Sequence, residues 1–276
     1  MLKDITLGQY FPGKSVIHRL DPRTKLVMLV VYIVALFLAD SWVSYGLMFL
    51  FLVTVIGLST IPPKAIVRGM KLLVVILIFT GVLNLFFTQD GTVLLHFWIL
   101  TITTGGLSRA VMMMSRILML ITGTFLLTYT TSPIALTDGL ESLMKPLKKI
   151  GVPVHELSMM MCIALRFIPT LIEETDKIMS AQKARGADFE TGSLMERAKA
   201  LIPILVPLFI SAFRRADELA TAMECRCYHG GEGRTRLRIL KYHARDFLVL
   251  FALLVLIALL VTINILGARF GWLYTM

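Results

Sequence analysis

Charged residues are scarce in this sequence. Asp, Glu, Lys and Arg make up 17% of its 276 residues, whereas they make up about a quarter of a typical soluble domain. Hydrophobic residues make up 57%, and the mean hydropathy is +0.78. This composition excludes an ordinary soluble globular domain and predicts an integral membrane protein.

Three further features are rare or missing. There are only three cysteines, an odd number, and two of them lie in a basic stretch, which favours reduced thiols over a disulfide framework. The first apolar run begins near Leu26 without a signal-peptide cleavage site, so we expect the amino terminus to stay in the cytoplasm. No Gly-x-x-x-x-Gly-Lys-Ser/Thr loop is present, so this chain is expected to bind no cofactor, and any use of ATP falls to partner proteins.

The charge that is present is mostly basic, with a net value of +10. Lys and Arg gather in the amino-terminal arm and between Lys145 and Arg245, while three connections between apolar runs carry almost none. The excess of positive charge on cytoplasmic loops, together with anionic lipid, explains this pattern, so no nucleic-acid partner is expected. We predict a multi-pass protein of the bacterial plasma membrane in contact with the lipid bilayer.

Five apolar runs are close to the ~20 residues needed to cross a bilayer. Asp21-Pro22 is typical of a helix start, and Pro62-Pro63 is typical of a stop. With the amino terminus cytoplasmic and the carboxyl terminus external, only Arg109 and Arg269 break the charge rule. The predicted spans are about 25–39, 43–61, 72–87, 107–131 and 247–267. Whether Leu94–Ile102, in the link before the fourth span, forms a short hairpin arm stays open.

The stretch between the last two spans predicts three further helices. Ser132-Pro133 opens the first, Ile134–Ile150, which Gly151 ends; the second runs from His155 to about Ala184, with a kink at Pro169; the third starts near Leu201. The second and third begin apolar and become charged, and each apolar half is shorter than a span. The fold class is therefore an all-α membrane protein with three domains: 1–131, the arm and four spans; 132–245, cytoplasmic or interfacial helices; and 246–276, the last span and an external tail.

The two long helices end alike. Each has an arginine at its end, an alanine four residues earlier and an aspartate nine residues earlier. They are Asp176, Ala181 and Arg185 in the first, and Asp217, Ala222 and Arg226 in the second. One such ending is adequately explained as a surface helix with a cation and a glycine at its carboxyl end. The repetition favours a pair of tips, whose small residues let the arginine enter a partner's groove and bind a carboxylate or carbonyls.

These endings resemble those of the transmembrane T component of energy-coupling factor transporters, importers of vitamins and metal ions. The hallmark of that family is a pair of Ala-Arg-Gly-like motifs at the ends of two cytoplasmic coupling helices. Ala184-Arg185-Gly186 matches it fully, and Cys225-Arg226-Cys227 keeps the arginine. The resemblance extends to the amino-terminal arm, the run Arg166–Pro169 and the final span. Because Cys227 replaces a glycine, we expect the second helix to run on to Gly230-Gly231.

The resemblance implies a non-enzymatic scaffold that couples ATP hydrolysis to vitamin or micronutrient uptake. Two ATP-binding cassette subunits would bind ATP and Mg²⁺, and a membrane-embedded S component would bind the substrate. Because the two tips are unequal, they would suit a heterodimer of ATPases. The residues assigned to the ATPases are Ala184, Arg185, Gly186, Cys225, Arg226 and Cys227, with Ala181, Ala222, Asp176 and Asp217, the aspartates orienting the tips. Those assigned to the S component are Met159, Met160, Met161, Pro169, Pro203 and Pro207.

Other residues leave alternatives open. Arg116 lies in an apolar span, where it either has a function or extends toward Arg109 and the outer surface. Cys225-x-Cys227-x-His229 lacks a fourth ligand and standard spacing, which disfavours a metal site. Glu173-Glu174 permits a membrane-embedded hydrolase as an alternative function, although the predicted spans contain no histidine. A stand-alone permease is the other alternative, but Arg116 is the only charge in mid-membrane.

Overall fold

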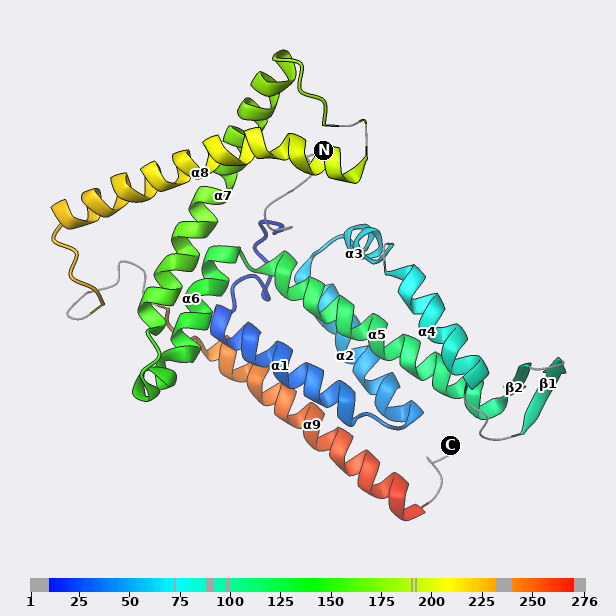
Figure 1. The fold of residues 1–276 in the computed structure, drawn as a ribbon. Helices are drawn as coiled ribbons and strands as arrows, with labels where there is room; N and C mark the ends of the chain where they lie inside the picture. The colour runs from blue at the N-terminus through cyan, green and yellow to red at the C-terminus, as the bar shows by residue number, and fades with distance from the viewer. Residues whose placement is uncertain are drawn as a thin grey trace. The chain divides into compact units, whose positions relative to one another are not determined.

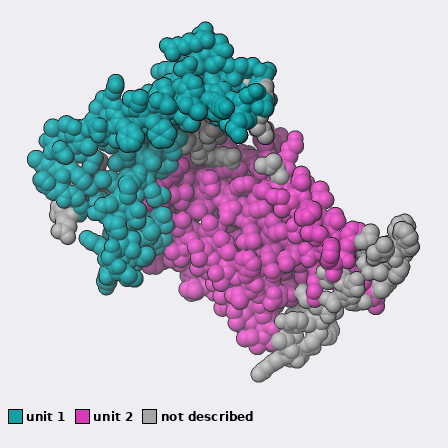
Figure 2. Space-filling view, viewed as in Figure 1, with its two compact units in different colours: residues 1–7, 140–239 teal, residues 8–139, 240–276 magenta. Residues whose placement is uncertain are grey.

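The computed structural model describes residues 10–71, 73–87, 92–97, 100–189, 191, 193–231 and 240–270. The chain divides into two compact units, coloured separately in Figure 2. The bundle unit is Gly8–Gly139 with Leu240–Met276, and the crossed-helix unit is Leu140–Ile239 with Met1–Leu7. Within the described residues both units are helical apart from one short hairpin, so the predicted all-α membrane fold is confirmed. The three predicted domain ranges stay a prediction.

The helices of the bundle unit follow the predicted apolar runs closely. α1, α2, α5 and α9 pack side by side, and α4 lies along α5 (Figure 1). Their starts obey local rules, since Asp21 caps α1 by accepting a hydrogen bond from the backbone N–H of Arg23 at 2.9 Å, with Pro22 as the first helical residue. The bounds are α1 Pro22–Leu38, α2 Trp42–Ser59, α3 Pro63–Met70, α4 Val74–Phe87, α5 Thr104–Thr130 and α9 Ala244–Phe270.

The core of the bundle unit lies where these helices meet. Leu36, Met48, Met119 and Leu260, from α1, α2, α5 and α9, are fully buried. Large apolar side chains on the outer faces are exposed, as at Val75 of α4 and several positions of α9. A bundle with an apolar core and an equally apolar outside is the arrangement expected of helices surrounded by lipid.

Length and composition qualify four described helices as membrane spans, or five if α3 and α4, bent by 63°, count as one. The four are α2, α5, α9 and α7, which runs from Val154 to Ala184. α1 was predicted as the first span, but with 17 residues it is just too short to qualify. α7 was predicted to start buried and end in water, yet it qualifies, with a mean hydropathy of 1.3 that is the lowest of the four. The chain is therefore a multi-pass membrane protein, as predicted.

A two-stranded antiparallel hairpin occupies the link before α5. β1, Val93–Phe97, pairs with β2, Leu100–Thr103, so that Val93 lies opposite Thr103. Thr103 then caps α5 by accepting a hydrogen bond from the backbone N–H of Gly106 at 3.0 Å. The hairpin that the sequence left open is therefore formed, and it leads directly into α5.

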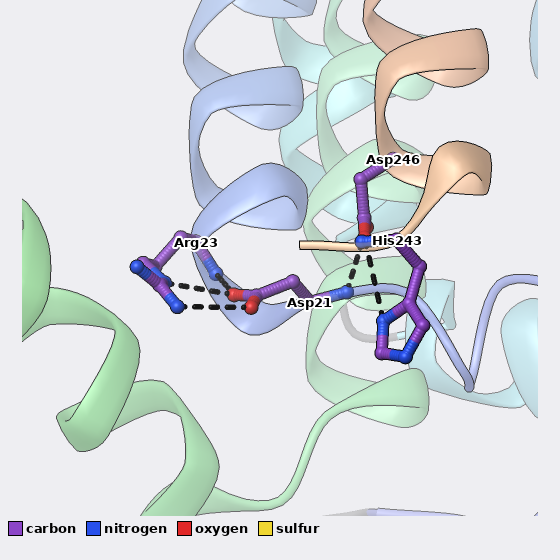
Figure 3. Close-up of polar contacts among 4 residues, drawn as sticks. All are labelled: Asp21, Arg23, His243 and Asp246. Carbon is purple, nitrogen blue, oxygen red and sulfur yellow. Dashed lines mark hydrogen bonds and ion pairs between the residues drawn. The ribbon is translucent and has the colours of Figure 1, made fainter. Parts of the chain in front are cut away.

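One buried carboxylate joins the starts of the first and last bundle helices (Figure 3). Asp246, 1% exposed, accepts a hydrogen bond from the backbone N–H of Asp21 at 2.9 Å with one oxygen and from the backbone N–H of His243 at 2.8 Å with the other. Asp21 in turn pairs with Arg23 at 3.1 Å, and the Arg23 guanidinium lies over the Tyr242 ring. Asp246 thus satisfies N–H groups that the helix starts leave unpaired.

Arg116 has a structural contact within the bundle unit. Its Nη2 donates a hydrogen bond to the carbonyl oxygen of Ala39 at 2.9 Å, and its guanidinium lies over the rings of Phe37 and Tyr45. Ala39 follows the last residue of α1, where carbonyls lack helical partners. Arg116 therefore holds the turn between α1 and α2 in place, a role that sequence reasoning did not identify.

The crossed-helix unit holds the two long helices, α7 (Val154–Ala184) and α8 (Leu194–Cys225), and α6 (Pro133–Met144) contains the boundary between the units. The first predicted short helix is α6 followed by a 3-10 helix, Lys145–Ile150, which Gly151 ends with φ 88° as predicted. α8 starts earlier than the predicted Leu201, because Ser193 and Glu196 form a capping box upstream of it. Figure 1 shows α8 passing across α7.

Candidate partner-binding site

The first tip is closed by a network of backbone hydrogen bonds. α7 ends just before Arg185, and Gly186 takes the left-handed conformation with φ 90°. The N–H of Gly186 donates to the carbonyl of Lys183 at 3.0 Å, and that of Ala187 donates to the carbonyl of Gln182 at 3.0 Å. These two bonds make a Schellman motif, for which glycine is the preferred residue. The predicted Arg-Gly helix ending is confirmed.

The second tip has the same backbone. α8 ends just before Arg226, and Cys227 takes the left-handed conformation with φ 55°. The N–H of Cys227 donates to the carbonyl of Glu224 at 2.8 Å, and that of Tyr228 donates to the carbonyl of Met223 at 3.1 Å. The prediction that this helix runs on to Gly230-Gly231 is wrong, because the paired hydrogen bonds hold a non-glycine residue in the conformation that stops it.

The repeat extends back along both helices in the same register as the two arginines. The Ser180 hydroxyl donates to the carbonyl of Asp176 at 2.7 Å, and the Thr221 hydroxyl donates to the carbonyl of Asp217 at 2.9 Å. Asp217 is exposed, and Asp176 is half-buried. The residues predicted at the tips themselves are all exposed: Ala181, Ala184, Arg185 and Gly186, and Ala222, Cys225, Arg226 and Cys227. Each tip therefore offers an exposed arginine beside small side chains.

An ion pair links α7 and α8 where sequence reasoning assigned no contact. The Nη2 of Arg215 lies 2.9 Å from a carboxylate oxygen of Glu174. Glu174 and Arg215 stand in the same register as the two tip arginines, so this contact could have been found by extending the repeat. A carboxylate paired with an arginine is poorly placed to act as a hydrolase's general acid or base.

The residues assigned to a membrane partner lie on the apolar halves of α7 and α8. Pro169 and Pro203 lie inside these helices and are exposed, as are Met160 and Met161, whereas Met159 and Pro207 are half-buried. On α8, seven large apolar side chains between 201 and 213 are between 46% and 68% exposed. They are Leu201, Ile202, Leu205, Val206, Phe209, Ile210 and Phe213. This surface, here called the α8 apolar face, is larger than the scattered exposed apolar residues of ordinary surfaces.

Comparison with known proteins agrees with this architecture. The model of the family described as CbiQ, cobalt transport protein, matches residues 13–237. This chain belongs to the EcfT family. A transmembrane protein EcfT of energy-coupling factor transporters from Acidaminococcus fermentans is 56% identical over 263 residues, which are 94% of this chain and 98% of that protein. The EcfT of Bacillus subtilis is 48% identical over 260 residues, with the same two shares.

Membership of the EcfT family confirms the resemblance drawn from the two arginine motifs. The chain is thus the membrane component of an energy-coupling factor transporter and takes part in a complex with other subunits.

Cys225 and Cys227 are free thiols at the second tip. Among the described residues, no group of three His, Cys, Asp or Glu side chains is arranged to hold a metal ion.

Proposed function

We propose that this EcfT family member is a non-enzymatic scaffold that couples ATP hydrolysis by two cytoplasmic ATPases to the movement of a membrane-embedded S component. The S component binds the vitamin or micronutrient, and the ATPases bind ATP and Mg²⁺. The amino terminus lies in the cytoplasm and the carboxyl terminus outside. No cofactor is assigned to this chain.

The matching Schellman ends are the observation that carries this proposal. Two helices of one unit end in the same backbone hydrogen bonds, each with an exposed arginine at the cap position. Duplicated ends suit two related partners, and a planar guanidinium suits grooves lined by carboxylates or carbonyls. Because Gly186 at one tip is replaced by Cys227 at the other, the two grooves differ, which favours an ATPase heterodimer.

The α8 apolar face supports a second partner within the membrane or at its surface. A face of this size costs free energy in water, so it is expected to be covered. Met160 and Met161 on α7 add flexible side chains that adapt to more than one partner surface. We assign this surface, with the prolines of both helices, to the S component.

Charge reversal at the tips tests the ATPase assignment. Arg185→Glu and Arg226→Glu, alone and together, are compared in the complex purified through a tag on this chain. Each arginine buried in a partner's groove is expected to contribute about 2 kcal/mol or more, so each reversal should weaken retention of the ATPases about 30-fold. Lys199→Glu is the matched control, since Lys199 is an exposed cation near the other end of α8.

The double variant decides the outcome. Loss of both ATPases from the double variant, with wild-type retention in the Lys199→Glu control, supports the proposal. If the double variant retains both ATPases and wild-type ATP hydrolysis, the tips are not docking elements and the proposal is wrong.

A further inference from the structure

The ion pair between α7 and α8 joins equivalent positions of the two helix repeats. Glu174 precedes Arg185 by the same number of residues as Arg215 precedes Arg226. At 1.5 Å per residue, each member of the pair is ~16 Å from its own tip along a helix. The contact therefore divides both helices at the same distance from their arginines.

A contact between equivalent positions is the kind of contact that a two-fold relation between two repeats produces. Identical side chains at such a position would face each other, and like charges there would repel. In this chain the position is an acid on α7 and a base on α8, and the two side chains make a 2.9 Å contact. The two repeats thus differ in charge at the position where they meet.

The neighbouring pair shows that this contact is specific. Glu173 and Arg214 carry the same charges one position earlier in each repeat, yet both side chains are exposed. The side chain of Glu174 is 23% exposed and that of Arg215 is 36% exposed. A partly buried carboxylate paired with an arginine holds its position more firmly than an exposed one.

We propose that Glu174 and Arg215 are positioning residues that form the pivot between α7 and α8. The pair fixes how α7 lies against α8 at this point of their crossing, so that movement of the tips is transmitted to the apolar halves on the other side. Without it, this contact loosens, and the tips move without displacing the apolar halves. This inference rests on the proposed coupling function and adds the contact through which the coupling passes.

Spin-label distance measurements on the reconstituted complex test the pivot without knowledge of the transported substrate. One label pair, at Ser180→Cys and Thr221→Cys, reports on the tips and avoids the residues assigned to the ATPases. A second pair, at Leu157→Cys and Ala198→Cys, reports on the apolar halves; all four positions are exposed. The native cysteines are replaced by serine, and this background must first retain both ATPases as the unsubstituted chain does, because Cys225 and Cys227 lie at the second tip. Distances are then compared without nucleotide and with a non-hydrolysable ATP analogue and Mg²⁺.

Charge reversal and charge exchange give the expected pattern. Glu174→Arg or Arg215→Glu alone should leave the nucleotide-driven shift at the tips and reduce the shift at the apolar halves about three-fold or more, as expected for directly coupled residues. The exchange of both charges should restore it. The same single and double changes at Glu173 and Arg214 are matched controls and should leave both shifts unchanged.

The outcomes separate the pivot from the coupling function. If the unsubstituted chain shows no shift at either label pair, the proposed function fails. If the tips shift but the reversals leave the apolar halves responding normally, or if exchange does not restore the response, the pivot is wrong and the function stands. Should a reversal prevent assembly, Glu174→Gln and Arg215→Gln remove the ion pair without repulsion and must reduce the same shift for the pivot to hold.

Discussion

Replacing Asp246 by alanine removes the carboxylate that joins the starts of α1 and α9. Two backbone N–H groups, those of Asp21 and His243, then lose their acceptor at 2.9 and 2.8 Å in a site where Asp246 is 1% exposed. A hydrogen bond to a charged group contributes about 1.5–3 kcal/mol, so the expected loss is about 3–6 kcal/mol. That is a large share of the roughly 5–15 kcal/mol that stabilises most folded domains.

The assay is thermal unfolding of the purified complex in detergent micelles, followed by circular dichroism. At about 2–4 °C per kcal/mol for a chain of this size, Asp246→Ala should lower Tm by on the order of 10 °C. Asp246→Asn keeps the shape and one acceptor oxygen but turns an NH₂ group toward the other N–H donor. It should therefore lose at least half as much stability.

Asp40 provides the control for loss of a negative charge from the same unit. Its side chain is 58% exposed and lies 4.0 Å from Arg116, so Asp40→Ala should change stability by about 1 kcal/mol or less. An equal fall in Tm for the Asp246 and Asp40 variants would refute the argument that the two backbone bonds, and not net charge, give Asp246 its effect.

The remaining substitutions test backbone and packing geometry. Gly186→Ala should destabilise the first tip by about 1 kcal/mol and so weaken binding of the proposed ATPases. The cost comes from the φ of 90°, because an added Cβ would meet no atom within 4 Å. Cys227→Gly removes the same strain and should strengthen binding at the second tip by a similar amount in the same assay. Gly123→Ala should lower Tm, since its new Cβ would lie 2.8 Å from a tyrosine ring of α1, while Gly57→Ala, which meets no atom within 4 Å, should not.

The features that the sequence predicted well are local ones. Asp21-Pro22, Gly151 and Gly186 act within one helical turn, so their residue types suffice to place a helix start or end. Hydropathy also predicted the positions of the bundle helices, because ~20 apolar residues are needed wherever a helix crosses a bilayer. The apolar run from Leu201 does not mark the start of α8, because the capping box of Ser193 and Glu196 starts the helix seven residues earlier, at Leu194.

The features that could not be predicted depend on distant residues. The carboxylate of Asp246 meets the N–H of Asp21, 225 positions away, and no single-sequence pattern pairs these two aspartates. Arg116 reaches Ala39 in the same way, across 77 positions. The helix end at Cys227 depends on local hydrogen bonds and not on distant residues. It was still not predicted, because cysteine is not a residue type that favours the left-handed conformation. The Schellman bonds outweighed the cost of a β-carbon there.

The two tips therefore share a geometry that their sequences share only in part. Their backbones make the same hydrogen bonds in the same register, so each arginine leaves its helix end in the same way. What differs is the next residue: Gly186 leaves open space, whereas Cys227 adds a thiol and carries the cost of a positive φ. A partner that contacts only the arginine would bind both tips alike, whereas one that also contacts the following residue would distinguish them. Cys227→Gly should therefore reduce the preference of a heterodimeric ATPase for one orientation. Cross-linking from each tip to each ATPase would measure this preference.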